Sequence, residues 1–103
     1  MRSARVFFAD VLAGHLTESE EGKRYHFQYV SSYDGPPISL TMPVREESYL
    51  FDEFPPFFDG LLPEGFQLEA LLRQKKIDRN DKFGQLLIIG ADTVGAVTVT
   101  GMS

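Results

Sequence analysis

The chain has 103 residues, no cysteine, no tryptophan and a formal net charge of -5. This length is that of one small domain, and the missing cysteines exclude a disulfide framework, a thiolate nucleophile and a cysteine zinc site. The negative net charge argues against a domain that binds nucleic acid by itself, because neutralising phosphates requires a basic surface. No window approaches the roughly 18 apolar residues of a membrane-spanning helix, and the apolar run near the N-terminus is too short for a signal peptide. We therefore expect a cytoplasmic protein.

The first part of the chain predicts β-strands. Residues 5–9 are rich in β-branched and aromatic side chains, and residues 14–17 continue as the second strand of a hairpin. Residues 18–23 are polar, contain a glycine and are expected to form a loop. Residues 25–30 alternate, with three aromatic side chains on one side and a histidine and a glutamine on the other, which is typical of a half-buried strand. Residues 38–42 alternate again and predict a fourth strand.

Two helices are expected around a proline-rich middle. The proline pair at residues 55–56 can open a short helix over residues 57–62, because proline is tolerated in a first turn. Pro63 then breaks or restarts that helix. Residues 64–76 are a stronger helix candidate, since Leu68 and two further leucines follow one another at i, i+3 and i+4.

A third helix and a last strand complete the pattern. Asp78 or Asn80 is expected to cap the helix, Gly90 is a natural C-terminal stop, and residues 94–100 return to strand composition. The order lacks a regular alternation of strands and helices, so a parallel doubly wound sheet is disfavoured. We expect an α+β fold: a small curved antiparallel β-sheet or partial barrel of about five strands, with two or three short helices inserted before the last strand.

Phe66 has an unusual position on the helix expected over residues 64–76. With a turn of about 100° per residue, the apolar face is centred near Leu68, and Phe66 lies about 160° away, on the side of Glu69 and Arg73. Such a phenylalanine is covered by a neighbouring loop, folded into the core by a distorted first turn, or exposed for a partner. The sequence leaves these alternatives open. Exposed aromatic anchors dominate the energetics of many interfaces.

Side chains that could carry chemistry are scattered. His15 and His26 are in no recognisable ligand spacing and are more typical of strand residues at polar positions. Carboxylates crowd the middle, where paired carboxylates could do acid–base work, but a loop-rich stretch more often carries solvated charges. Half of the basic residues lie within ten positions. This cluster could form a surface for an acidic partner or phosphate, or it could be the solvated end of a helix. The carboxylates are Glu46, Glu47, Asp52, Glu53, Asp59 and Glu64, and the basic residues are Arg73, Lys75, Lys76, Arg79 and Lys82.

A resemblance to a known family begins at residues 56–65, PFFDGLLPEG. This stretch resembles the P-F-F-x-x-L-L-P-E-G motif in the N-terminal subdomain of HipA-like serine/threonine kinases. Upstream, ISLTMPVR at residues 38–45 is similar to the family's S-L-S-L-P-L-R strand. Downstream, DKFGQLL at residues 81–87, followed by Gly90 and GAV at residues 95–97, is similar to its D-x-F-x-L-L…G…G-A-V ending. The blocks keep the family's order and cover nearly the whole chain.

The resemblance implies a binding role. In full-length members a kinase body follows this subdomain, whereas this chain ends at Ser103 and shows no catalytic aspartate loop, magnesium-binding motif or ATP-binding lysine motif. A free-standing copy resembles the HipS-type antitoxins of three-gene HipBST systems, in which the kinase toxin HipT lacks this segment and HipB, a helix-turn-helix protein, binds DNA. The resemblance thus implies a non-enzymatic antitoxin without cofactor or metal, whose partners are a HipT-like kinase and a HipB-like protein.

The resemblance also suggests where the kinase binds. A segment that packs on the kinase in the fused protein can pack on it in trans, through apolar anchors with a polar rim. The position after L-L-P-E-G is usually polar or small in full-length members, and Phe66 departs from that. A bulky residue there would project into the kinase cleft and hinder substrate or nucleotide. The expected partner-binding residues are Phe54, Phe57, Phe58, Leu61, Leu62, Pro63, Glu64, Gly65, Phe66 and Arg73.

Other readings stay open at this point. The chain could be a stabilising or activating subunit of a split HipA-like kinase, which is a binding role of opposite sign. It could be a small ligand-binding or enzymatic domain that uses the acidic middle segment, which predicts converging carboxylates with shifted pKa values. It could also be a piece of a full-length HipA-like kinase.

Overall fold

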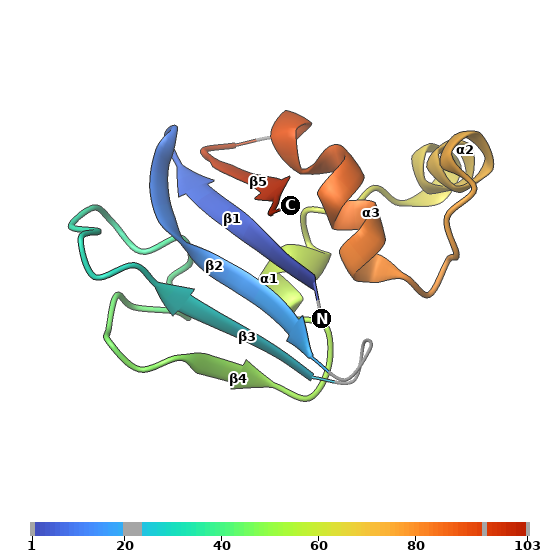
Figure 1. The fold of residues 1–103 in the computed structure, drawn as a ribbon. Helices are drawn as coiled ribbons and strands as arrows, with labels where there is room; N and C mark the ends of the chain where they lie inside the picture. Colours follow the sequence, from blue (N-terminus) through green and yellow to red (C-terminus); the bar gives the residue numbers. More distant parts are fainter. Residues whose placement is uncertain (1, 20–23, 94, 103) are drawn as a thin grey trace.

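The computed structural model describes residues 2–19, 24–93 and 95–102. Its strands form one sheet, and its α-helices lie between the fourth and fifth strands, which confirms the expected α+β fold (Figure 1). Among the described residues no helix is both long and apolar enough to cross a membrane. The elements are β1 (Arg2–Phe8), β2 (Val11–Ser19), β3 (Arg24–Tyr29), β4 (Tyr49–Phe51), α1 (Pro56–Asp59), α2 (Gly65–Lys75), α3 (Lys82–Ile89), the 3-10 helix η1 (Gly90–Asp92) and β5 (Val97–Gly101).

The sheet is open and antiparallel, with the strands in the order β4-β3-β2-β1-β5. β1 and β2 form the hairpin that the sequence predicts. Its turn places Ala9 and Asp10 at φ values of 49° and 68°, as in the two-residue turns that match the twist of paired strands. A register shift between Val6 and Phe7 marks a β-bulge, which increases the local twist of the hairpin.

β3 has the alternation that the sequence predicts. Tyr25, Phe27 and Tyr29 are buried, whereas His26 is half-buried and Gln28 is exposed. Because successive side chains of a strand point to opposite faces, the aromatic residues of β3 form the middle of the core.

The strand expected over residues 38–42 is wrong, because only an isolated bridge between Ser39 and Met42 forms there. Ile38 and Met42 are buried, so the alternation correctly indicates which side chains face the core. Their backbone groups, however, bind a side chain: the Tyr29 hydroxyl accepts from the Ile38 N–H (3.0 Å) and donates to the Met42 carbonyl (2.5 Å). A segment whose polar backbone groups are satisfied in this way needs no strand partner. The fourth strand is β4 instead.

The loop expected over residues 18–23 is wrong at its start, because β2 continues through Ser19. The Glu18 side chain is buried, and a buried carboxylate requires partners. Arg2 on β1 supplies them, with its Nε 2.7 Å from Glu18 Oε1 and its Nη2 2.9 Å from Oε2. Residues 20–23 of the expected loop lie outside the described residues.

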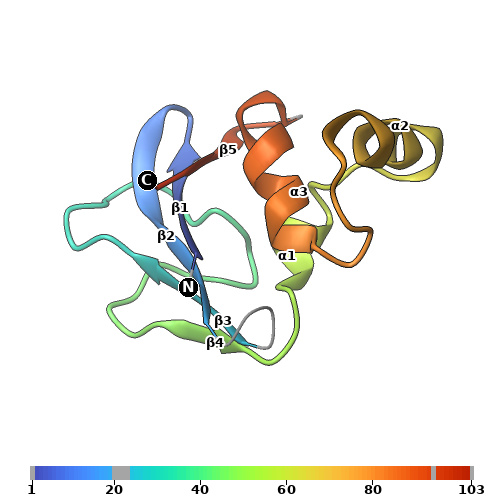
Figure 2. The same ribbon diagram turned by 45° about the vertical axis from the view of Figure 1, so that its right-hand side comes forward.

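The core lies between one face of the sheet and helices α1 and α3 (Figure 2). Phe27 of β3, Phe58 of α1, and Phe83 and Leu86 of α3 are completely buried. The ring centroids of Phe27 and Phe58 are 5.9 Å apart, and those of Phe83 and Tyr25 are 6.3 Å apart. In both views the described helices lie on this side, and none of them crosses the opposite face of the sheet.

The N-terminus of α3 is capped by Asp81, so the expectation of Asp78 or Asn80 is wrong. The Asp81 carboxylate accepts a hydrogen bond from the Gly84 N–H at 3.0 Å, which satisfies a backbone donor of the first turn. The Asp78 carboxylate instead accepts from the Asn80 N–H at 2.7 Å. Asp78 thus stabilises the turn that precedes the helix.

Gly90 follows α3, as the sequence predicts, but its backbone stays right-handed and begins η1. A β-carbon at Gly90 would lie 2.3 Å from the Val99 carbonyl oxygen. The glycine is therefore needed for the close approach of η1 to β5, and the C-terminal end of α3 covers the outer edge of the sheet there. β5 begins at Val97, and residue 94 of the strand expected over residues 94–100 lies outside the described residues.

Candidate functional site

The segment from residue 54 to residue 66 links β4 to α2 and contains most of the expected partner-binding residues. Phe58 is completely buried, so it anchors the segment in the core. Phe54 is half-buried and meets the Tyr25 ring edge-on at 5.3 Å between centroids. Phe57 is half-buried and meets the Phe58 ring at 5.2 Å. The phenylalanines at 54, 57 and 58 thus mainly fix the path of the chain.

The next residues form one wall of a groove of about 640 Å³. Leu61, Leu62 and Pro63 are half-buried and line this groove after α1. They lie there because α1 ends at Asp59 and the chain then turns away from the core. In this turn the Leu61 N–H donates to the Phe58 carbonyl, and the Leu62 N–H donates to the Asp59 carbonyl. The opposite wall comes from α2, the end of α3 and η1. Its residues are Gln67, Lys75, Ile88, Ile89, Asp92 and Thr93.

Apart from Lys75, which belongs to the basic cluster noted in the sequence, the residues of this second wall were not predicted from the sequence. One signal was present, because Ile88 is apolar but lies off the face formed by Phe83 and Leu86 on the same helix. The structure leaves Ile88 38% exposed. Ile88 therefore supplies a partly exposed apolar side chain to the groove.

α2 projects from the rest of the fold, at one end of the molecule (Figure 1). It buries none of its residues completely. Leu68, Leu71 and Leu72 are half-buried. The sequence thus correctly predicts which side of α2 faces the protein, but this side is only partly buried. Phe66 is 95% exposed, which rules out the readings in which a loop or the core covers it.

The ends of α2 are set by two residues in the left-handed region. Gly65 has a φ of 59° where the helix begins, and Lys76 has a φ of 55° where it ends. Glycine adopts this conformation without steric strain, so Gly65 lets the chain turn sharply after Glu64, which is exposed and makes no side-chain cap. Phe66 therefore stands directly after a sharp turn, at the near end of a projecting helix.

Ion pairs tie the helical region together at its surface. Lys82 Nζ lies 3.0 Å from Asp59 Oδ1 and joins the start of α3 to the end of α1. Arg79 Nη2 lies 2.5 Å from Glu69 Oε1 and joins the linker after α2 to that helix. Arg73 is exposed on α2, beside the groove residue Lys75 in sequence. Of the basic cluster predicted from the sequence, two members thus serve internal contacts and the others stand at the end of α2.

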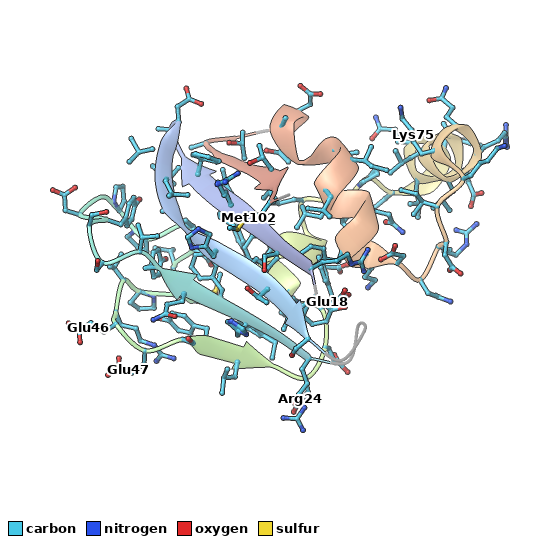
Figure 3. All side chains as sticks on the ribbon, in the orientation of Figure 1. Glu18, Arg24, Glu46, Glu47, Lys75 and Met102 are labelled. Carbon is cyan, nitrogen blue, oxygen red and sulfur yellow. The ribbon has the colours of Figure 1, made fainter. Side chains whose placement is uncertain are left out.

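The six carboxylates of the middle segment do not converge. All six are exposed, and they are distributed over the loop before β4, the turn after it and the ends of α1 and α2. Figure 3 shows Glu46 and Glu47 at one end of the molecule and Lys75 at the other. No group of three or more metal-ligating residues occurs in the described part of the chain. This arrangement is that of solvated charges and gives no support to acid–base catalysis.

A cluster of Arg2, Glu18 and Asp81, which are not among the residues that line the groove, shifts the pKa of a carboxyl group. Arg2 contacts Asp81 (Nη2 to Oδ1, 2.8 Å) as well as Glu18, and its guanidinium carbon lies 5.2 Å above the Phe83 ring. Hydrogen bonding to Arg2 holds the pKa of Asp81 below its ordinary value, and the Gly84 N–H adds to this effect against the opposing effect of burial. Burial and the charge of Glu18 raise the pKa of Tyr25. The cluster fastens β1 and β2 to the start of α3.

Comparison with known proteins gives this architecture a family. A family model described as HipA N-terminal domain matches residues 4–100. The chain therefore belongs to the HipA N-terminal domain family. A solved structure described as the N-terminal domain of HipA toxin superposes with a TM-score of 0.77 and 30% sequence identity, covering 100% of this chain and 94% of that one.

Two sequence relatives show this family segment in proteins of different length. An uncharacterised protein of Haemophilus influenzae is 34% identical over 99 residues, which cover 96% of this chain and 92% of that protein. A putative kinase, Y4mE, of Sinorhizobium fredii is 27% identical over 100 residues, which cover 94% of this chain but only 24% of that protein. The same segment thus occurs as nearly a whole small protein and as about a quarter of a longer one.

Proposed function

We propose that this chain is an antitoxin that binds and neutralises a HipA-like serine/threonine kinase toxin of the HipT type. Three observations support the proposal. The chain belongs to the HipA N-terminal domain family, it is related to a solved HipA toxin domain, and the segment in question forms part of a longer putative kinase in one relative. A domain that packs against a kinase body within one chain can pack against a separate kinase body through the same surface.

The observation that carries the proposal is the exposure of α2. Phe66 is 95% exposed on a helix that buries none of its residues completely, so its ring is available as an aromatic contact for a partner. Beside it lies the groove formed by Leu61, Leu62 and Ile88. The groove combines these apolar side chains with the polar residues Gln67, Lys75, Asp92 and Thr93, and protein interfaces likewise combine apolar anchors with polar surroundings.

We assign Phe66 the role of the blocking residue. Its position after the turn at Gly65 directs the ring away from the domain. In a complex it would enter the cleft of the kinase and hinder substrate or nucleotide, while the groove residues and Arg73 hold the two proteins together. The acidic net charge of -5 agrees with a complex in which a HipB-like helix-turn-helix protein makes the DNA contacts. The domain itself would carry out no chemistry.

The test is co-expression with a HipA-like kinase of the HipT type. We expect this chain to restore growth, to co-purify with the kinase and to lower its phosphorylation rate in a purified assay. An activating subunit, which is the second candidate, would deepen the growth defect and raise the rate. Failure to co-purify with the kinase would contradict both roles.

A further inference from the structure

The face of the sheet opposite the helices is a second surface without a cover. The described helices all lie on the other side (Figures 1 and 2). Because side chains alternate along a strand, this outer face carries Arg5 of β1, His15 and Thr17 of β2, and His26 of β3. The strand register places Arg5 opposite His15 and Thr17 opposite His26. These residues therefore form one continuous group across three neighbouring strands.

The charge of this face differs from that of the whole chain. The net charge is -5, yet the outward positions described on β1 to β5 contain no aspartate or glutamate. Glu18, the acidic residue of β2, is buried on the inner face, where Arg2 binds it. The acidic pair Glu46 and Glu47 stands at the rim, at the left of Figure 3. The outer face of this acidic domain thus carries Arg5 and further hydrogen-bond donors, with no carboxylate at its described outward positions.

Part of this face is already engaged inside the domain, because the Thr17 hydroxyl pairs with the Ser3 hydroxyl at 3.3 Å and the Gln28 side-chain amide donates to the Glu46 carbonyl at 2.9 Å. Within the described residues, the side chains of Arg5, His15 and His26 have no hydrogen-bond or ion-pair partner. By contrast, Arg2, Arg79 and Lys82 each bind a carboxylate of the domain. A guanidinium offers five N–H donors and an imidazole offers at least one. His15, Thr17, His26 and Gln28 line a shallow hollow, so their polar atoms surround a common space.

We propose that this outer sheet face binds an acidic segment of a protein partner, separately from the surface around Phe66. Carboxylates of the segment would accept hydrogen bonds from Arg5 and the two histidines. Charge complementarity of this kind steers association and sets specificity. The exposed Leu50, at 80%, lies opposite His26 in the β3–β4 register and supplies an apolar contact at the edge.

The arrangement favours an acidic protein segment over two other occupants. A nucleic acid would bring a long row of phosphates past Glu46 and Glu47 and would meet a domain of net charge -5, whereas nucleic-acid binding needs a basic surface. In a symmetric dimer, the same surface patch of each copy would form the interface. The positively charged Arg5 of one copy would then lie in the same interface as Arg5 of the other. Like charges in contact are unfavourable.

The experiment is an NMR titration of the full chain at low salt with a ten-residue glutamate-rich peptide. We expect amide shifts concentrated on the outward positions of β1, β2 and β3, and a loss of affinity of about threefold or more for Arg5→Glu, since each exposed charge pair contributes modestly. Lys76→Glu, which makes the same charge change at the exposed C-terminal end of α2, is the matched control and should bind the peptide as the parent does.

Three results would overturn the proposal. The first is a set of amide shifts that is confined to α2 or spread over the whole surface, or an equal loss of affinity in Arg5→Glu and Lys76→Glu. The second is tighter binding of a single-stranded DNA oligonucleotide than of the peptide. The third is self-association in sedimentation that Arg5→Glu abolishes, because this would assign the face to a second copy. None of these results depends on binding of a kinase, so they leave the proposed antitoxin function to its own test.

Discussion

Replacing Phe66 by alanine separates binding from folding, because the side chain is 95% exposed in the free domain. Its removal leaves no cavity, so the free energy of unfolding should change by less than about 0.5 kcal/mol. In a complex nearly all of its apolar surface is available for burial, which is worth about 1.5–3 kcal/mol for a phenylalanine. We therefore expect Phe66→Ala to weaken kinase binding by about 10- to 150-fold and to lose growth rescue.

Leu40→Ala is the matched control for this experiment. Leu40 is also 95% exposed, but it lies on the loop between Ser39 and Met42, far along the chain from α2. Affinities would be measured by calorimetry with the purified kinase, and folding by urea denaturation. The reasoning is refuted if Phe66→Ala binds within about twofold of the parent, or if Leu40→Ala loses as much affinity.

Three further changes test the architecture that presents this surface. Asp81→Asn keeps a capping side chain but removes the charge paired with Arg2, and should cost about 1 kcal/mol or less at neutral pH. Because the pKa of Asp81 is lowered in the folded protein, its ionised carboxylate stabilises the fold above the ordinary carboxyl range. This stabilisation is lost as the pH falls through the lowered pKa. Urea denaturation at several acidic pH values should therefore show a free energy of unfolding that depends less on pH in the variant than in the parent. Gly90→Ala places a β-carbon 2.3 Å from the Val99 carbonyl oxygen and should lower the unfolding free energy by about 1–3 kcal/mol, as overpacking does, in thermal denaturation. Gly65→Ala meets no atom within 4 Å, so its cost is only the left-handed backbone, about 1–2 kcal/mol; Gly65→Asn should recover part of it in the same measurement.

The alternation of apolar and polar residues along the sequence predicts which side chains are buried. It does not predict which strands pair, because pairing depends on residues that are distant in the sequence. The buried aromatic residues of β3 follow directly from period two. The same pattern over residues 38–42 indicates burial correctly but not pairing, because the Tyr29 hydroxyl takes the place of a neighbouring strand. Pairing passes to β4, whose three residues are too few to show a periodicity.

Charged residues show the same limit. Glu18 looks like part of a polar loop because its partner, Arg2, is 16 positions away, and Asp81 caps α3 while binding the same arginine 79 positions away. These contacts exist only when the strands and α3 meet. For the candidate site, the wall at Leu61 and Leu62 follows from the sequence, whereas the facing wall at Ile88 depends on how α2 and α3 pack.

The stability of α2 is the step that connects the fold to the proposed function. Isolated helices shorter than about 12–15 residues are marginal in water, and most helices in proteins are stabilised by the burial of an apolar face. α2 has 11 residues and buries none of them completely, and its ion pair between Glu69 and Arg79 is exposed and therefore weak. The fold thus supplies little of the burial that this helix needs. A partner that covers Phe66 would supply it, and part of the contact energy would then be spent on ordering the helix. Among the described residues, α2 contributes none to the hydrophobic core or to the ion pairs of Arg2. We therefore expect the sheet, α1 and α3 to stay folded in the free chain even where α2 is not fully formed.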